Sequence, residues 1–243
     1  IPERYRPRIA GTHCGVPPGR RIGDLMFFEN AIDFLPILLK GAVVTIEITA
    51  CAFVLSSVLG LILALLKVSP NRAVSTVGST VVNVIRGLPI IVQLFYMYFV
   101  LPDLGIQLSA FQAGVLGLGI AYSAYQAENF RAGIEAIDRG QIEAAHAIGM
   151  RGPMIMRRVV LPQAFRIALP PYGNTLVMLL KDSSVASTIT VAEITRAGQL
   201  IASSTFQNMS VYTLVALLYL ALGLPLMFGV NRLGKRLSLR RSA

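Results

Sequence analysis

Charged and polar side chains interrupt several long apolar stretches of this sequence. A charge at the centre of a bilayer costs about 2.5–3.5 kcal/mol on insertion scales, so such side chains usually face a wet cavity or a partner helix. Together they offer both signs of charge, phenols, an amide and hydroxyls, which suits reversible binding of a small polar molecule. We therefore predict that they line a polar path. These path residues are Glu47, Arg86, Tyr122, Tyr125, Gln126, Glu128, Lys181, Asp182, Ser183 and Ser184.

Some of these charges also have a purely structural interpretation. Glu128 and Arg131 are three residues apart, share one face of a helix, and can form an intrahelical ion pair. Arg86 can instead extend its charged head toward water. Lys181 and Asp182 are adjacent and therefore about 100° apart on a helix, so they cannot both hide against one neighbour. This pair favours the path, or a fold contact beside it.

The sequence offers no arrangement for covalent catalysis or metal binding. The two histidines, His13 and His146, are far apart, and Cys14 and Cys51 form no Cys–x–x–Cys motif. The phosphate-binding pattern G-x-x-x-x-G-K-[ST] does not occur either. We expect no catalytic residue, no metal site and no cofactor on this chain.

Five apolar segments are long enough to carry the path residues across a bilayer, which takes roughly 20 residues per helix. They cover about 35–66, 74–102, 110–133, 167–192 and 209–231. The second is interrupted at Arg86–Pro89, where Gly and Pro bend or break a helix. Of the 243 residues 54% are apolar and 14% charged, against about 25% charged in soluble domains. The fold class is therefore an all-α integral membrane protein.

The basic residues between the apolar segments alternate in number. Segments 67–73, 134–166 and 232–243 are basic, whereas 103–109 has no Lys or Arg and 193–208 has only Arg196. The positive-inside rule places the basic segments, and thus the C-terminus, in the cytoplasm. The net charge of +10 then indicates anionic lipid as the partner, not nucleic acid.

A polar segment, 1–30, precedes the membrane body, 31–243. The alternation places the N-terminus outside, but 1–30 is itself basic and does not fit this side. The chain starts at Ile1 instead of Met, which leaves open an upstream segment and the topology of 1–30.

A patterned polar stretch, "IEAAHAIGMRGPMIMRRVVLPQA", separates the third and fourth apolar segments. Gln141–Ile148 predicts a short helix, and Gly149 is a natural helix stop. Pro153 suits the first turn of a second helix, which we expect to end at Leu161–Pro162. The pattern predicts a helix–turn–helix lying at the cytoplasmic surface. The plainer alternative is an ordinary amphipathic pair of interfacial helices.

The spacing in this stretch resembles the EAA loop of ABC importer permeases. That pattern is Glu–Ala–Ala, three residues, Gly, nine residues, an aliphatic residue, one residue and Leu–Pro. Here it is Glu143–Ala144–Ala145, Gly149, Val159 and Leu161–Pro162, with every spacing kept.

Three further stretches are similar to segments of polar amino acid ABC importer permeases, the group for histidine, glutamate, glutamine, arginine or opines. They are "RGLPIIVQLFYMYFVLP" (86–102), "AYSAYQAENFRAGIEAI" (121–137) and "LLKDSSVASTITVAEI" (179–194). Leu88 stands where that group has Thr, so one hydroxyl is lost. The resemblance covers about 31–235.

The resemblance implies a five-span, MetI-like ABC importer permease core in a bacterial inner membrane, with cytoplasmic coupling helices at 141–164. It implies a separate ATPase chain, which holds ATP and Mg, a second permease subunit, identical or related, and an extracytoplasmic amino-acid-binding protein. The path residues would then bind an amino acid, the carboxylates attracting its ammonium and Arg86 or Lys181 its carboxylate. The residues implied to contact the ATPase are Glu143, Ala144, Ala145, Gly149, Arg151, Leu161 and Pro162.

Other classes fit the sequence less well. An integral membrane enzyme needs a nucleophile–base pair or a metal set near one interface. An ion-driven transporter often shows inverted repeats, which five segments with one large cytoplasmic loop do not suggest. An ABC permease for another small polar solute is the nearest alternative.

Overall fold

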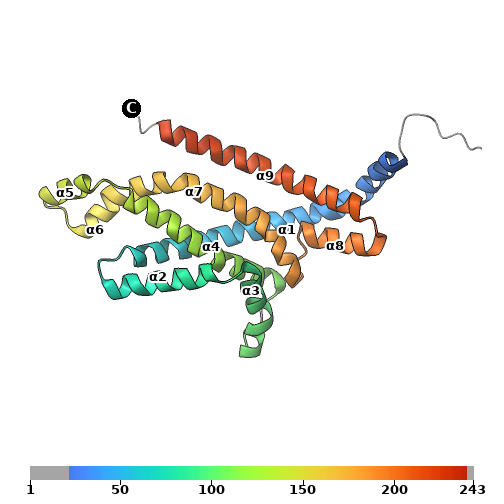
Figure 1. Cartoon of the computed structure of the whole chain (residues 1–243), viewed down its shortest axis with the longest axis horizontal. Helices are drawn as coiled ribbons and strands as arrows, with labels where there is room; N and C mark the ends of the chain where they lie inside the picture. Colours follow the sequence, from blue (N-terminus) through green and yellow to red (C-terminus); the bar gives the residue numbers. More distant parts are fainter. Residues whose placement is uncertain (1–21, 240–243) are drawn as a thin grey trace, which may run out of the picture.

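The computed structural model describes residues 22–239, with side chains from 32 to 234. Every regular element within these residues is a helix, which confirms the expected fold class. The long helices run side by side along one axis (Figure 1). The polar segment 1–30 lies largely outside the described residues.

Helix α1 (Ile22–Lys67) is the longest element and the first expected span. Its buried side chains recur at helical spacing, with Leu38, Thr45, Ile48 and Ala52 all near zero exposure. The same helix approaches α4 closely at Gly60, where a Cβ atom would lie 2.6 Å from the Cβ of Gln126. Only a residue without a side chain permits this crossing, so Gly60 sets how near the two helices lie.

Helices α2 (Arg72–Gly87) and α3 (Ile90–Phe95) form the expected interrupted span, bent by 97°. The bend leaves carbonyls at the end of α2 without helical partners. The amide nitrogen of Gln93 donates to two of them, Ile85 O at 2.9 Å and Leu88 O at 3.1 Å. A π turn, η1 (Tyr96–Val100), and a 3₁₀ turn, η2 (Leu101–Leu104), then lead sideways out of the bundle (Figure 1).

Helix α4 (Ala110–Glu135) covers the segment that was expected as the third span, and it begins with a capping box between Ser109 and Gln112. It packs against α1, α2 and α7. By length and composition, two described helices could cross a membrane, Ile32–Lys67 and Asn208–Gly234, or up to four if each bent pair counts as one span. Helix α4 is not among them. Its Gly, Ser and Gln residues suit a helix surrounded by other helices.

Helices α5 (Arg139–Ala147) and α6 (Gly152–Ile155) form the expected helix–turn–helix. The predicted end of its second helix at Leu161–Pro162 is wrong. A π turn, η3 (Met156–Val160), carries the helix on into α7 (Leu161–Asp182). Within this turn the Leu161 N–H bonds to Met156 O, five residues back. The wider turn accommodates Pro162, which has no N–H to donate.

The fourth expected span is also broken. Helix α7 continues as a 3₁₀ turn, η4 (Ser183–Ile189), and the segment then bends by 49° into α8 (Ile194–Thr205). The segment 193–208 was expected only as a connection, so α8 is an additional element. It packs between α1 and α9 (Asn208–Leu239), the last expected span. The helix forms because Ile194, Ala197 and Ile201 fall on one face and bury there.

Candidate functional site

The elbow, defined as residues 139–160, is held in shape by a side-chain cap and by backbone hydrogen bonds. Asp138 caps α5 by accepting from Gly140 N at 2.7 Å. After α5, Gly149 adopts φ +80°, a left-handed conformation that other L-residues rarely adopt. Gly149 N donates to His146 O at 2.9 Å and Met150 N to Ala145 O at 3.1 Å. These bonds fix the direction in which the chain leaves α5.

The inner face of the elbow is buried against the long helices. Gln163 on α7 also donates from its amide nitrogen to Gln141 Oε1 at 2.7 Å. A displacement of the elbow would therefore be passed to both α4 and α7. The buried cluster contains Ile134, Ile137, Ala145, Ile155, Val160 and Ala164.

The outer face of the elbow presents Glu143 and Ala144, both exposed, beside Ile148, whose side chain is 78% exposed. Small residues next to a protruding isoleucine form a surface that another protein could approach closely. Among the other predicted contact residues, Ala145 is buried and Leu161 half-buried, whereas Arg151 and Pro162 are exposed. Their contact with a second chain stays a prediction.

The elbow lies toward one end of the molecule (Figure 1). The turn between α1 and α2 and the C-terminal part of α9 lie toward this same end, and α8 lies at the other. The segments that were predicted to be cytoplasmic from their Lys and Arg content are thus gathered on one side.

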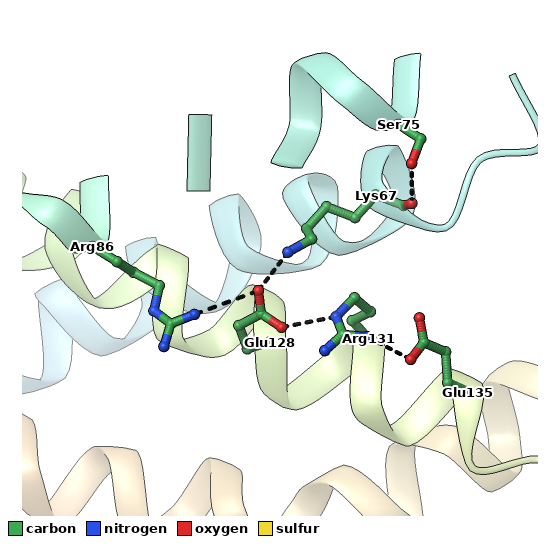
Figure 2. Close-up of polar contacts among 6 residues, drawn as sticks. All are labelled: Lys67, Ser75, Arg86, Glu128, Arg131 and Glu135. Carbon is green, nitrogen blue, oxygen red and sulfur yellow. Dashed lines mark hydrogen bonds and ion pairs between the residues drawn. The ribbon is translucent and has the colours of Figure 1, made fainter. Parts of the chain in front are cut away.

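Glu128 lies at a junction of three helices, and Figure 2 shows the side chains around it. Lys67 Nζ from α1 is 2.5 Å from Glu128 Oε1, and Arg86 Nη1 from α2 is 3.7 Å from the same oxygen. Arg131 Nε, one turn along α4, is 2.8 Å from Glu128 Oε2, which confirms the expected pair. We call Lys67, Arg86, Glu128 and Arg131 the Glu128 junction.

Arg86 sits at the bend between α2 and α3 and is only partly neutralised. Its guanidinium carbon lies 5.7 Å from the ring centroid of Tyr125, within cation–π range. Its side chain is 45% exposed. The guanidinium of Arg86 forms no hydrogen bond with another described side chain, and its one ion pair, with Glu128, is 3.7 Å long, so its N–H groups can still bind an anion.

Asp182, at the end of α7, accepts a hydrogen bond of 2.6 Å from the hydroxyl of Tyr122 on α4. Lys181 is exposed while Asp182 is half-buried, so the two diverge as predicted. Ser183 Oγ donates to Leu180 O and Ser184 Oγ to Lys181 O, both at 2.7 Å. Both serine hydroxyls therefore donate their hydrogen bonds to carbonyls in the last turn of α7.

The remaining path residues are not gathered at one place. Gln126 is fully buried, and its Oε1 accepts from Asn129 Nδ2 at 3.0 Å. Glu47 is exposed on α1, and no ion pair among the described side chains includes it. A groove of about 430 Å³ between α1 and α8 is lined by Lys40, Ser204 and apolar residues, and by none of the path residues. Their part in a path stays a prediction.

Glu193 is a buried carboxylate that sequence reasoning missed. Its oxygens cap α8 by accepting from Thr195 N at 2.8 Å and Arg196 N at 2.7 Å, and they accept from the Tyr219 hydroxyl at 2.6 Å. Thr45 on α1 accepts from Ile194 N at 3.2 Å. This cluster ties α8 to α1 and α9. The sequence did contain a signal for this cap, because Glu193 directly precedes Ile194, Ala197 and Ile201, which are apolar and at helical spacing.

Comparisons with known proteins agree with this geometry. Residues 56–239 match the family described as binding-protein-dependent transport system inner membrane component. A probable amino-acid ABC transporter permease protein of Sinorhizobium fredii is 39% identical over 200 residues, covering 82% of this chain and 85% of that protein. A probable glutamine ABC transporter permease protein of Bacillus subtilis is 37% identical, covering 84% and 95%. The crystal structure of an amino acid ABC transporter with histidines superposes with a TM-score of 0.81 at 37% identity, covering 86% of this chain and 98% of that one.

Proposed function

The chain belongs to the family of binding-protein-dependent transport system inner membrane components, and from this membership we propose that it is the permease subunit of an ATP-driven amino acid importer. The two sequence relatives above are amino acid ABC transporter permeases by name, the solved structure is of an amino acid ABC transporter, and the chain spans 85–98% of the length of these proteins. The observation that carries the proposal is the elbow, a hydrogen-bonded motif with an exposed face and with the spacing of an ABC coupling loop.

Coupling follows from how the elbow is built. Its outer face offers Glu143, Ala144 and Ile148 to a groove on a separate ATPase. Its inner face is packed on α4 and α7. When ATP, bound with Mg on the ATPase, closes that protein, the elbow moves and carries these two helices with it.

The transported molecule would be an amino acid zwitterion, which needs partners of both signs. Asp182 can attract the ammonium, because no cation among the described side chains is paired with it and the Tyr122 hydroxyl holds it in place. Arg86 and Lys181 are exposed and can attract the carboxylate. Tyr125, whose ring centroid lies 5.7 Å from the Arg86 guanidinium carbon, would border these groups.

The assembly would contain two permease subunits, two ATPases and an extracytoplasmic binding protein. Exposed Glu47 on a membrane-spanning helix supports a second subunit or a wet path at that face, because lipid is a poor neighbour for a carboxylate. We place the protein in a bacterial inner membrane, with the elbow and C-terminus in the cytoplasm, from the basic residues of these segments.

The test is reconstitution of the complete importer in liposomes, with uptake measured for a panel of amino acids. Glu143→Lys should reach the membrane but abolish both uptake and the ATPase activity stimulated by the binding protein. Asp103→Lys is the matched control, since Asp103 is also an exposed acid but lies in η2, outside the elbow. Unchanged uptake by the Glu143 variant would contradict the docking role, and uptake of other solutes alone would contradict the substrate class.

A further inference from the structure

The Glu128 junction concentrates three cations on one carboxylate. Lys67 ends α1, Arg86 lies in the last turn of α2, and Arg131 belongs to α4. The side chains of Lys67, Glu128 and Arg131 are 11%, 21% and 33% exposed. Arg131 is also within 2.5 Å of Glu135, whose side chain is 56% exposed.

This arrangement does not suit a carboxylate that receives a substrate ammonium. Both oxygens of Glu128 already face cations at 2.5 and 2.8 Å, so a ligand would have to displace Lys67 or Arg131. The carboxylate instead joins three helices at one point (Figure 2).

The junction restrains α2 near both of its ends. Near its start, Ser75 Oγ donates to Lys67 O at 2.7 Å, and the same Lys67 reaches Glu128 with its ammonium. Near its end, Arg86 reaches the same carboxylate from directly before the bend. The 16 residues of α2 span about 24 Å, so Lys67 and Arg86 approach Glu128 from opposite directions along the helix.

Helix α4 connects this junction to the elbow. From Glu128 it runs about 10 Å to Glu135 at a rise of 1.5 Å per residue. Only 136–138 separate α4 from α5. Because this link is short and Ile134 and Ile137 are buried against the elbow, α4 and the elbow are expected to move together.

We propose that Glu128 is a positioning residue that holds α2, with its bend at Gly87–Pro89, against α4, so that movement of the elbow repositions the bend. This inference rests on the proposed function. Arg86 is the contact that changes, because at 3.7 Å and half-exposed it is held less tightly than Lys67 and Arg131. Without the carboxylate, the cations of α1, α2 and α4 repel one another, and elbow and bend move independently.

The decisive measurement is the number of amino acid molecules transported per ATP hydrolysed by the complete importer in liposomes. Glu128→Gln and Arg86→Gln should each lower this ratio at least about fivefold, the lower end of typical coupling energies. The double variant should be no worse than the poorer single variant, because both single variants remove the same Arg86–Glu128 contact. Glu128→Asp should restore part of the ratio.

Glu135→Gln is the matched control, because it removes an exposed carboxylate from the same helix and the same arginine without touching the junction's carboxylate. Its ratio should equal that of the original protein. Arg86→Gln alters a partly exposed side chain, so it can be measured even if Glu128→Gln fails to assemble. The ratio is taken at saturating amino acid, so that weaker binding of the substrate carboxylate by this variant does not limit uptake.

Given amino acid uptake by the original importer, an unchanged ratio in both variants would overturn the inference alone. This includes a proportional fall of uptake and ATPase activity, which a purely structural Glu128 would cause. An importer that moves no amino acid even in its original form would overturn the proposed function, and this inference with it.

Discussion

At the scale of single residues, the surroundings of three carboxylates separate their roles. Glu128 forms ion pairs with cations, whereas Asp182 accepts a hydrogen bond from one tyrosine hydroxyl. Glu193 accepts hydrogen bonds from two backbone N–H groups and from one tyrosine hydroxyl. Of these, Asp182 keeps the most unsatisfied acceptor capacity, because a carboxylate can accept about four hydrogen bonds. It is therefore the acid best prepared to receive an ammonium.

Replacing Asp182 should accordingly impair transport more than replacing its hydrogen-bond donor. Asp182→Asn removes the charge and should lower amino acid uptake about tenfold or more, since a hydrogen bond to a charged group contributes about 1.5–3 kcal/mol. Tyr122→Phe keeps the charge and should have a smaller effect. Uptake and co-purification with the ATPase are measured together, and the ATPase should stay bound in both variants. Normal uptake by the Asp182→Asn variant would contradict the assignment of Asp182 to the substrate path.

At the scale of elements, the elbow depends on one backbone conformation. Gly149 takes φ +80° with open space around it, so the constraint on this residue comes from its dihedral angle and not from crowding. The direction of α6 relative to α5, and hence the position of Glu143 and Ile148 relative to α7, follows from this turn.

Gly149→Ala should therefore distort the elbow, at a cost of roughly 1–2 kcal/mol for a left-handed non-glycine residue. We expect weaker binding of the ATPase and reduced uptake, with partial recovery in Gly149→Asn, because Asn tolerates this conformation better. Gly152→Ala is the matched control: Gly152 also has open space around it but no positive φ. Affinity for the ATPase is the measurement, and equal values for the two alanine variants would refute the argument.

At the scale of the whole molecule, the ends of the bundle differ in charge and in the elements they carry. The elbow lies toward one end and the turn between α8 and α9 at the other (Figure 1). Ile148 in the elbow is 78% exposed and Met209 at the start of α9 is 87% exposed, so both positions can report on the side of the membrane.

Cysteine labelling should place these two positions on opposite sides. In a background with Cys14 and Cys51 replaced by Ser and with the ATPase absent, Met209→Cys should react with an impermeant maleimide in intact cells. Ile148→Cys should react only after the membrane is opened, because the Lys and Arg content assigns its segment to the cytoplasm. The reverse pattern would contradict the proposed orientation and the coupling role of the elbow.

The sequence by itself determined the features that depend on neighbours along the chain. Apolar stretches gave the long helices, Gly87 and Pro89 the bend in the second span, and Gly149 the stop after α5. The pair Glu128–Arg131 was likewise predictable, because residues three apart face one another on any helix.

Only the tertiary structure decided which distant groups meet. Lys67 and Arg86 reach Glu128, Gln126 is buried, and α8 is held by Glu193, because α1, α2, α4 and α9 approach one another at particular distances. The approach at Gly60 depends on how two helical surfaces fit, and spacing within one helix carries no information about the partner surface. The local sequence therefore determined the long helices and the turn at Gly149, but neither α8 nor the continuation of the elbow into α7. Side-chain packing between helices determined the environment of each charge.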